Sequence, residues 1–200
     1  MGGGADSRIP GLLKGYFAPE ELRVVIRTYS FDPEIGRAQI ASWVDACHPD
    51  LVVGESLGAI QALRVRGVPR LFVSPSLGAP EKLCRAAWLT LLPGGGWLLH
   101  KRYRVKEGDR QPLRFRWKVL RKYGAHAQEA FAAAREGGYN FAFFGRYDHY
   151  MRSGVVSIER WKALFGEDSY ALYEGSHFME EEYVEQLLVP KIREILDLKK

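Results

Sequence analysis

Short apolar runs alternate along this chain with longer segments in which apolar residues recur every three or four positions. Runs rich in aliphatic, β-branched and aromatic residues predict β-strands. There are five of them, at residues 22–29, 50–54, 69–74, 139–144 and 169–174. The run at 50–54 is continuous enough to be buried on both faces of a sheet.

The longer periodic segments predict helices. They lie at 33–47, 57–65, about 125–135, 157–165 and 180–198. The first has Asp32 at its N-cap position and Pro33 in its first turn, and the last contains Pro190, which predicts a kink. Strand–helix alternation at these lengths predicts right-handed βαβ units and a mostly parallel sheet covered on both faces, which is a three-layer α/β/α fold.

The alternation is interrupted between residues 79 and 138, and we interpret this segment as an insertion in one domain that spans 1–200. Apolar residues alternate with cationic ones at Leu113, Phe115, Trp117 and Val119. A similar alternation at 102–106 and turn-forming residues at 107–110 predict a β-hairpin with one apolar and one cationic face. The Ala-rich helix at about 125–135 then leads back to the sheet.

The composition is that of an ordinary soluble globular protein, with 46% hydrophobic and 26% charged residues. The net charge of +5 is unevenly distributed, because residues 101–122 contain ten basic and two acidic residues. That segment carries +8 and the rest of the chain −3. Since the basic segment contains no recognised nucleic-acid motif, we expect a solvated cationic face and no nucleic-acid partner.

No apolar run approaches the roughly 20 residues that a membrane-spanning helix needs. The first residues have neither the basic region nor the apolar region of a signal peptide. Cys47 and Cys84 are far apart and lie in unrelated contexts, so we expect neither a disulfide framework nor a metal cluster. These features predict a cytoplasmic protein without a membrane span, a metal or a cofactor.

Residues 54–58 read G-E-S-L-G and match the pattern G-x-S-x-G. The match follows a predicted buried strand and begins a predicted helix, the context in which it forms a tight, strained turn that raises a serine above the sheet edge. Flanking glycines are needed there because larger side chains would collide. Ser56 is therefore the candidate nucleophile, and the N–H of Leu57, at a helix N-terminus, is a candidate oxyanion donor.

A serine nucleophile needs a base, and the base needs an orienting acid. His177 follows the last predicted strand and Asp148 the strand before it, and the carboxyl ends of parallel strands meet at one edge of a sheet. The order Ser56, Asp148, His177 is the nucleophile–acid–histidine order of this architecture. Asp168 would lie at the opposite end of the sheet, and we interpret His149 as a supporting or solvent-facing residue.

With these motifs the chain resembles a small member of the α/β-hydrolase superfamily, over nearly all of its length except the insertion. The resemblance implies that Ser56 is the nucleophile, Asp148 the acid and His177 the base. It also implies a second oxyanion donor in a glycine-rich loop that follows an early strand. The candidates are Gly3, Gly4 and Ala5. No strand precedes them here, so either that strand is missing from the sequence or the fold has trimmed its edge.

Lids in this superfamily usually arise from insertions after the strand that ends near Ser74. The resemblance therefore implies that the insertion is lid-like and roofs the site. Phe115 and Trp117 would then line an acyl pocket, and the arginines of the insertion would favour anionic substrates. Glu55, beside the candidate nucleophile, is a further candidate substrate-binding residue.

The main hypothesis is the hydrolysis of a small-molecule carboxylic ester or thioester through an acyl-enzyme on Ser56. One alternative is a non-catalytic α/β-hydrolase-like binding protein that uses the basic insertion to contact a partner or an anionic ligand. An adaptor for nucleic acid or another anionic ligand is a third hypothesis, which predicts steeply salt-dependent binding. The sequence favours no particular acyl-chain length or oligomeric state.

Overall fold

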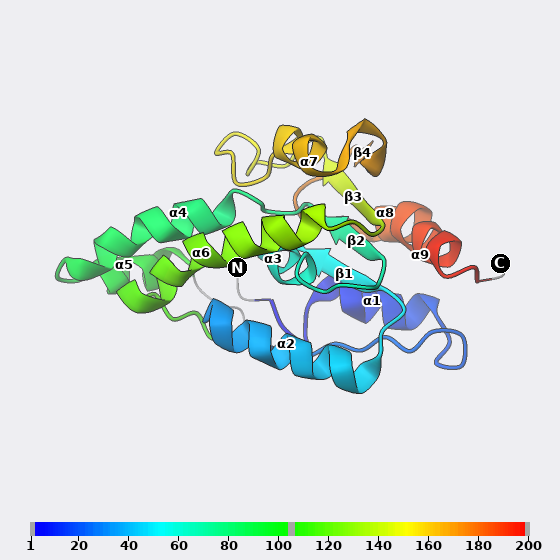
Figure 1. The fold of residues 1–200 in the computed structure, drawn as a ribbon, viewed down its shortest axis with the longest axis horizontal. Helices are drawn as coiled ribbons and strands as arrows, with labels where there is room; N and C mark the ends of the chain where they lie inside the picture. Colours follow the sequence, from blue (N-terminus) through cyan, green and yellow to red (C-terminus); the bar gives the residue numbers. More distant parts are fainter. Residues whose placement is uncertain (1–2, 104–106, 199–200) are drawn as a thin grey trace.

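The computed structural model describes residues 3–103 and 107–198, and its centre is a parallel β-sheet (Figure 1). The strands are β1 (Val52–Glu55), β2 (Arg70–Val73), β3 (Asn140–Gly145) and β4 (Tyr170–Tyr173). They lie in the order β1-β2-β3-β4, and each neighbouring pair is parallel. The four predicted strands from 50–54 onward are therefore confirmed, and their carboxyl ends share one edge of the sheet.

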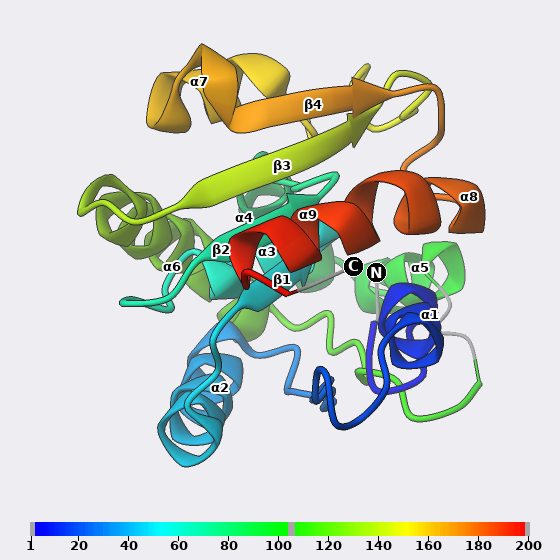
Figure 2. The same cartoon turned by 90° about the vertical axis from the view of Figure 1, so that its right-hand side faces the viewer.

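Helices cover both faces of this sheet (Figure 2). They are α1 (Arg8–Tyr16), α2 (Pro33–Cys47), α3 (Ala59–Ala62), α4 (Ala79–Ala86), α5 (Gly95–Arg102), α6 (Trp117–Arg135), α7 (Ile158–Phe165), α8 (Glu181–Tyr183) and α9 (Val189–Ile195). A 3-10 turn (Ser56–Gly58) precedes α3, another (Ala87–Leu91) follows α4, a third (Glu167–Ser169) precedes β4, and a π-helical turn (Val184–Leu188) joins α8 to α9. Among the described residues, no helix is long and apolar enough to cross a membrane.

Alternate residues of each strand feed two separate cores. Leu71 and Val73 of β2 pack with α1 and with the segment that runs from α8 to α9. Phe72, between them, packs on the opposite face with α3, α6 and α7, where Trp161 is fully buried. This division explains why three successive residues of β2, Leu71, Phe72 and Val73, are apolar without alternation. The three-layer α/β/α arrangement is thereby confirmed.

Residues 22–29 are not a strand, and that prediction was wrong. The segment is extended, but within the described residues it joins no β-ladder. Its polar groups are bound by loops instead: Thr28 Oγ1 accepts from the Ala5 N–H at 2.9 Å, and the Tyr29 carbonyl accepts from the Gln111 side chain at 3.1 Å. The β-branched pattern thus encodes the extended backbone but not a pairing partner.

The predicted hairpin in the insertion was also wrong. Residues 95–102 form α5, and Trp117 begins α6 instead of continuing a strand. The period-two pattern does appear in burial, because Leu113 and Phe115 are buried and Arg114 is exposed. This stretch packs on Phe31 and the insertion's own helices rather than on a second strand. Of the predicted first arm, residues 104–106 lie outside the described residues.

The other predicted helices are present, but some of them begin or end at other residues than predicted. Helix α2 begins as expected, with the Asp32 side chain accepting from the Glu34 N–H at 3.1 Å. The helix predicted at 57–65 is shorter, with its first turn in 3-10 form. The one predicted at about 125–135 extends back to Trp117, and the closing helix changes to a π-turn just before Pro190.

The side chain of Arg70, at the start of β2, joins the sheet to its surrounding loops. The residue is 2% exposed, and its guanidinium donates to the carbonyls of Leu63 (2.8 Å), Val65 (3.1 Å) and Gly137 (2.9 Å). The Arg70→Met variant leaves these carbonyls without that donor, so its free energy of unfolding should fall by about 3 kcal/mol in urea denaturation.

Arg66→Met is the matched control, because Arg66 forms an exposed ion pair with Glu136. It should change the free energy of unfolding by less than about 1 kcal/mol. Equal losses for the two variants would contradict the role given to the buried guanidinium.

Candidate active site

Four polar side chains gather at the carboxyl edge of the sheet. Ser56 follows β1, Ser76 follows β2, Asp148 follows β3 and His177 follows β4. Because the strands are parallel, each chain leaves the sheet at the same edge, and this brings together residues up to 121 positions apart. Asp168 lies before β4, at the other end of that strand, as expected.

Ser56 sits in a strained turn. Its φ is +51°, in the left-handed region that costs a residue with a Cβ about 1–3 kcal/mol. A Cβ at Gly54 would meet the Ala62 Cβ at 2.9 Å and the Ala59 Cα at 3.1 Å, so only glycine lets helix α3 approach β1 this closely. At Gly58 the nearest atom is 3.4 Å away, which is ordinary contact. The first glycine of the motif is thus the sterically necessary one.

A chain of short contacts joins three of these residues. The Nε2 atom of His177 lies 2.8 Å from the Ser56 Oγ, and its Nδ1 lies 2.7 Å from Asp148 Oδ2. His177 and Asp148 are 1% and 4% exposed. The other carboxylate oxygen of Asp148 accepts from the Tyr150 N–H at 2.8 Å, so both oxygens are engaged and the carboxylate is fixed in orientation.

Close backbone packing holds the His177 loop against the end of β3. A Cβ at Gly145 would lie 2.2 Å from the Ser176 carbonyl oxygen, so a larger residue would displace this loop. The same carbonyl accepts from the Tyr173 hydroxyl at 2.8 Å, and the Ser176 hydroxyl donates to the Glu180 carboxylate at 2.7 Å. These contacts fix the distance between His177 and Asp148.

Ser76 is a site residue that the sequence reasoning missed. Its Oγ lies 3.1 Å from the Ser56 Oγ, and its N–H donates to the Ser56 carbonyl at 3.0 Å. The residue is 2% exposed. Its position just after a predicted buried strand was the available signal, since the same rule selected Asp148 and His177.

The candidate oxyanion donors differ in whether their N–H groups already donate to another acceptor. The N–H of Leu57 lies in the first turn of a helix, where amides have no intrahelical acceptor. The N–H of Gly4 donates to the Ser7 Oγ at 3.0 Å, and that of Ala5 to the Thr28 Oγ1 at 2.9 Å. The carbonyl of Gly3 accepts from the Gln111 N–H at 2.9 Å. Two of the three amides in the glycine-rich loop are therefore already bonded.

Glu55 brings a carboxyl group close to this site. Burial raises the pKa of Glu55, and the nearby guanidinium groups of Arg8 and Arg110 act in the opposite direction. Both arginines are held by backbone carbonyls, Arg8 by that of Met179 and Arg110 by that of Asp6. The surroundings of Ser56 are therefore polar on the side of the N-terminal loop.

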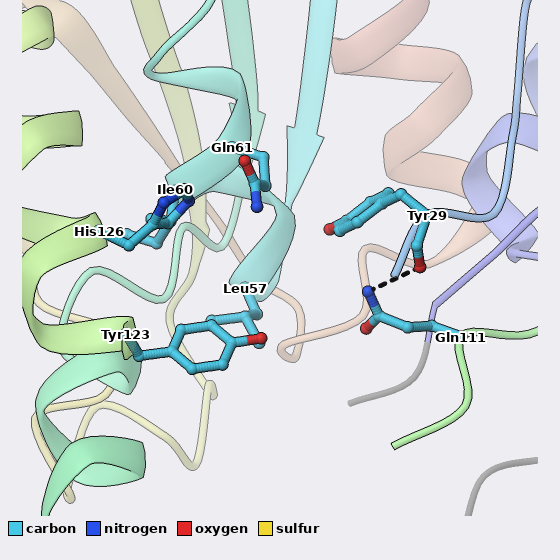
Figure 3. Close-up of a pocket in the computed structure, with 7 residues that line it drawn as sticks. All are labelled: Tyr29, Leu57, Ile60, Gln61, Gln111, Tyr123 and His126. Atoms are coloured by element: carbon cyan, nitrogen blue, oxygen red, sulfur yellow. Dashed lines mark hydrogen bonds between the residues drawn. The ribbon is translucent and has the colours of Figure 1, made fainter. Parts of the chain in front are cut away.

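A small cavity lies behind Leu57 (Figure 3). Its volume is about 10 Å³, enough for about one water molecule. The lining residues are Tyr29, Leu57, Ile60, Gln61, Gln111, Tyr123 and His126. Phe115 is buried near this region against Phe31, with ring centroids 5.6 Å apart, while Trp117 packs on Trp88 at 4.7 Å. Both aromatic side chains are thus already in contact with other rings.

The other candidates have simpler surroundings. His149 is exposed, with its ring centroid 6.2 Å from that of His177. Cys47 and Cys84 are free thiols. Within residues 3–103 and 107–198, no group of three or more histidine, cysteine, aspartate or glutamate side chains is arranged to hold a metal ion.

Comparison with solved structures identifies the fold. The crystal structure of Paleococcus ferrophilus monoacylglycerol lipase matches with a TM-score of 0.53 and 14% identity, over 86% of this chain and 77% of the lipase. An E-2-(acetamidomethylene)succinate hydrolase matches with a TM-score of 0.47 and 13% identity, over 84% of this chain and 75% of that chain. No family model and no curated protein sequence matches this chain. The likeness to the lipase shows that the chain has the α/β-hydrolase fold.

His126, in the wall of the cavity, makes stability depend on pH. Burial and the nearby Arg64 lower the pKa of His126 from 6.5 to about 4. Between these pH values the unfolded chain binds a proton that the folded chain does not. The free energy of unfolding should therefore fall as the pH decreases through this window, by up to about 3 kcal/mol at 1.36 kcal/mol per pKa unit.

Urea denaturation at several pH values measures this contribution. The His126→Gln variant should lose this pH-dependent contribution. The control His100→Gln, at an exposed histidine, should leave the dependence of the free energy of unfolding on pH unchanged. An unchanged profile for His126→Gln would show that the dependence arises elsewhere.

Proposed function

We propose that this protein is a serine hydrolase that cleaves a carboxylic ester or thioester through an acyl-enzyme on Ser56. The observation that carries this proposal is the continuous chain of contacts from the Ser56 Oγ through His177 to Asp148, at 2.8 Å and 2.7 Å. The strained backbone of Ser56 supports it, because such strain is characteristic of functional positions. The likeness of the fold to a lipase is consistent with hydrolysis.

In the acylation step, the Ser56 Oγ attacks the carbonyl carbon of the substrate as its proton passes to His177 Nε2. The buried Asp148 carboxylate keeps the Nδ1 proton of His177 in place and stabilises the imidazolium that forms. The tetrahedral intermediate then collapses. The bond from carbon to the leaving oxygen or sulfur breaks, and the Nε2 proton moves to the leaving group.

In the deacylation step, water attacks the acyl carbon and gives a proton to His177 Nε2. Collapse of the second tetrahedral intermediate returns that proton to the Ser56 Oγ and releases the acid. The Leu57 N–H is the proposed donor to the oxyanion in both steps. Gly3, Gly4 and Ala5 are the candidates for the second donor, and Gly4 or Ala5 would first have to release its present acceptor.

The same bonded amides favour one alternative, a binding protein of this fold that does not turn over its ligand. A single oxyanion donor would stabilise the tetrahedral intermediate less, since one such donor contributes about 10²–10³ to the rate constant of the chemical step. Phe115, Trp117 and Glu55 remain proposed contributors to substrate binding in either case. The two functions differ in whether Ser56 reacts covalently.

Reaction with a fluorophosphonate probe separates the two functions. The intact protein should be labelled in a time-dependent manner and should hydrolyse short p-nitrophenyl esters, while Ser56→Ala should do neither. Ser153→Ala, at an exposed serine, is the matched control and should be labelled like the intact protein. An intact protein that resists the probe would refute the hydrolase and favour the binding protein.

Ser76 is proposed as a positioning residue for this reaction. Since the Ser56 hydroxyl donates to His177, the Ser76 hydroxyl is the donor in its contact with the Ser56 Oγ. Losing this hydrogen bond in Ser76→Ala should lower kcat about tenfold, with KM little changed, because about 1.4 kcal/mol of orientation is lost.

The control for Ser76→Ala is Ser74→Ala. Ser74 is an equally buried serine after the same strand, and it forms no hydrogen bond with Ser56 among the described contacts. Ester hydrolysis and the rate of fluorophosphonate labelling are measured on both. If both variants lose activity equally, Ser76 acts only through the packing of this loop.

A further inference from the structure

A group of large apolar side chains is exposed between residues 88 and 98, which run from the 3-10 turn after α4 into α5. Six of them lie within eleven residues and are 44–66% exposed. We call this surface the cap tip; it consists of Trp88, Leu89, Leu91, Leu92, Trp97 and Leu98. The other exposed large apolar residues are scattered along the chain, which is ordinary for a protein surface. A cluster of six exposed large apolar side chains is typical of an interaction site.

The exposure of the cap tip is not a by-product of poor packing. The inner side of α4, the 3-10 turn and α5 is well packed, with Leu83, Ala87 and Leu99 at most 8% exposed. These residues belong to an apolar cluster that also contacts Leu57, next to the candidate nucleophile. This part of the chain therefore carries apolar side chains both on the side that faces the core and on the side that faces outward. The segment lies at one end of the long axis of the molecule (Figure 1).

Basic side chains surround the cap tip. The sequence contains no acidic residue from Lys82 to Tyr103. Exposed cations come from α4, from α5, from the segment that leads into α6 and from the first turns of α6: Arg85, Lys101, Arg102, Arg114, Arg116, Lys118 and Arg121. None of these forms a salt bridge with a carboxylate in the described part of the chain. Their charge is therefore available to an outside partner.

The cations and the aromatic rings of this region are interleaved. The Lys101 Nζ lies 5.1 Å from the centre of the Trp97 ring, and the Arg121 Cζ lies 5.4 Å from that of Trp117. Trp88 packs edge-on against Trp117 with centroids 4.7 Å apart, which places the Arg121 end of α6 beside the cap tip. Tryptophan with flanking lysine or arginine is the combination that suits a lipid–water boundary, because the ring occupies the headgroup level while the cation reaches the phosphates.

We propose that the cap tip docks the protein on the surface of an anionic phospholipid bilayer. Trp97, Leu92 and their neighbours would enter the boundary between headgroups and acyl chains, and the surrounding cations would bind lipid phosphates. A second copy of the chain is a poorer occupant, because pairing two cap tips would bring their unpaired cations face to face. This inference goes beyond the proposed hydrolase activity and does not depend on it.

Sedimentation with phospholipid vesicles tests the proposal. The full chain should bind vesicles made of equal parts phosphatidylcholine and phosphatidylserine. It should bind pure phosphatidylcholine at least about tenfold more weakly, and added salt should weaken binding to the mixed vesicles. The variants Trp97→Ala and Leu92→Ser should each reduce binding to the mixed vesicles, by about tenfold for the tryptophan. The double variant Lys101→Glu/Arg102→Glu should reduce binding to the mixed vesicles only.

Matched controls exclude general effects of lost hydrophobicity or charge. Ile35→Ser removes an equally exposed apolar side chain from α2, and Arg23→Glu/Arg152→Glu makes the same charge change away from the cap tip. Both should bind as the intact chain does, and thermal unfolding followed by circular dichroism checks that every variant is folded. Ser56→Ala should also bind normally, so a failed hydrolase assay and a failed vesicle assay remain separate results.

Two results would overturn the proposal. One is that the intact chain does not sediment with the mixed vesicles, or that the control variants lose as much vesicle binding as the cap-tip variants do. The other is a dimer in sedimentation velocity that Trp97→Ala converts to monomer while no vesicle binding is seen. That result would assign the cap tip to self-association.

Discussion

The backbone of Ser56, held at a φ of +51°, is the constraint on which the rest of the site depends. The turn is fixed from two sides. Gly54 lets α3 pack directly on β1, and the Ser76 N–H donates to the Ser56 carbonyl at 3.0 Å. These contacts stabilise a conformation that costs about 1–3 kcal/mol on its own. In return, the hydroxyl stands at the carboxyl edge of the sheet, within reach of a histidine that comes from the far edge strand.

The parallel register of the sheet gives the other half of the arrangement. Strands β3 and β4 end side by side, so the loops that carry Asp148 and His177 leave the sheet together. Gly145 allows the two loops to touch, and both oxygens of the buried Asp148 carboxylate are bonded. The sheet thus fixes the coarse positions of the three side chains, while close backbone packing fixes their distances.

The same reasoning explains what could be predicted from the sequence. Uninterrupted apolar runs identified the four strands, and the order of strands along the chain identified which loops meet. Residues 22–29 and 113–119 show the limit, because local alternation encodes an extended or half-buried backbone but not its partner. The engagement of the Gly4 and Ala5 amides was equally hidden, since it depends on Ser7 and on Thr28, which is 23 residues from Ala5. The outward apolar face of the cap tip was hidden too, because the sequence of the insertion does not reveal which of its faces lacks a covering element.

The proposed hydrolase mechanism requires that Ser56 forms a covalent acyl intermediate. Its most direct test is mass spectrometry of the protein quenched with acid during turnover of a p-nitrophenyl ester. An acyl-enzyme mechanism predicts a mass increase of one acyl group, located on the peptide that contains Ser56. Hydrolysis without any adduct, or with the acyl group on another residue, would contradict it.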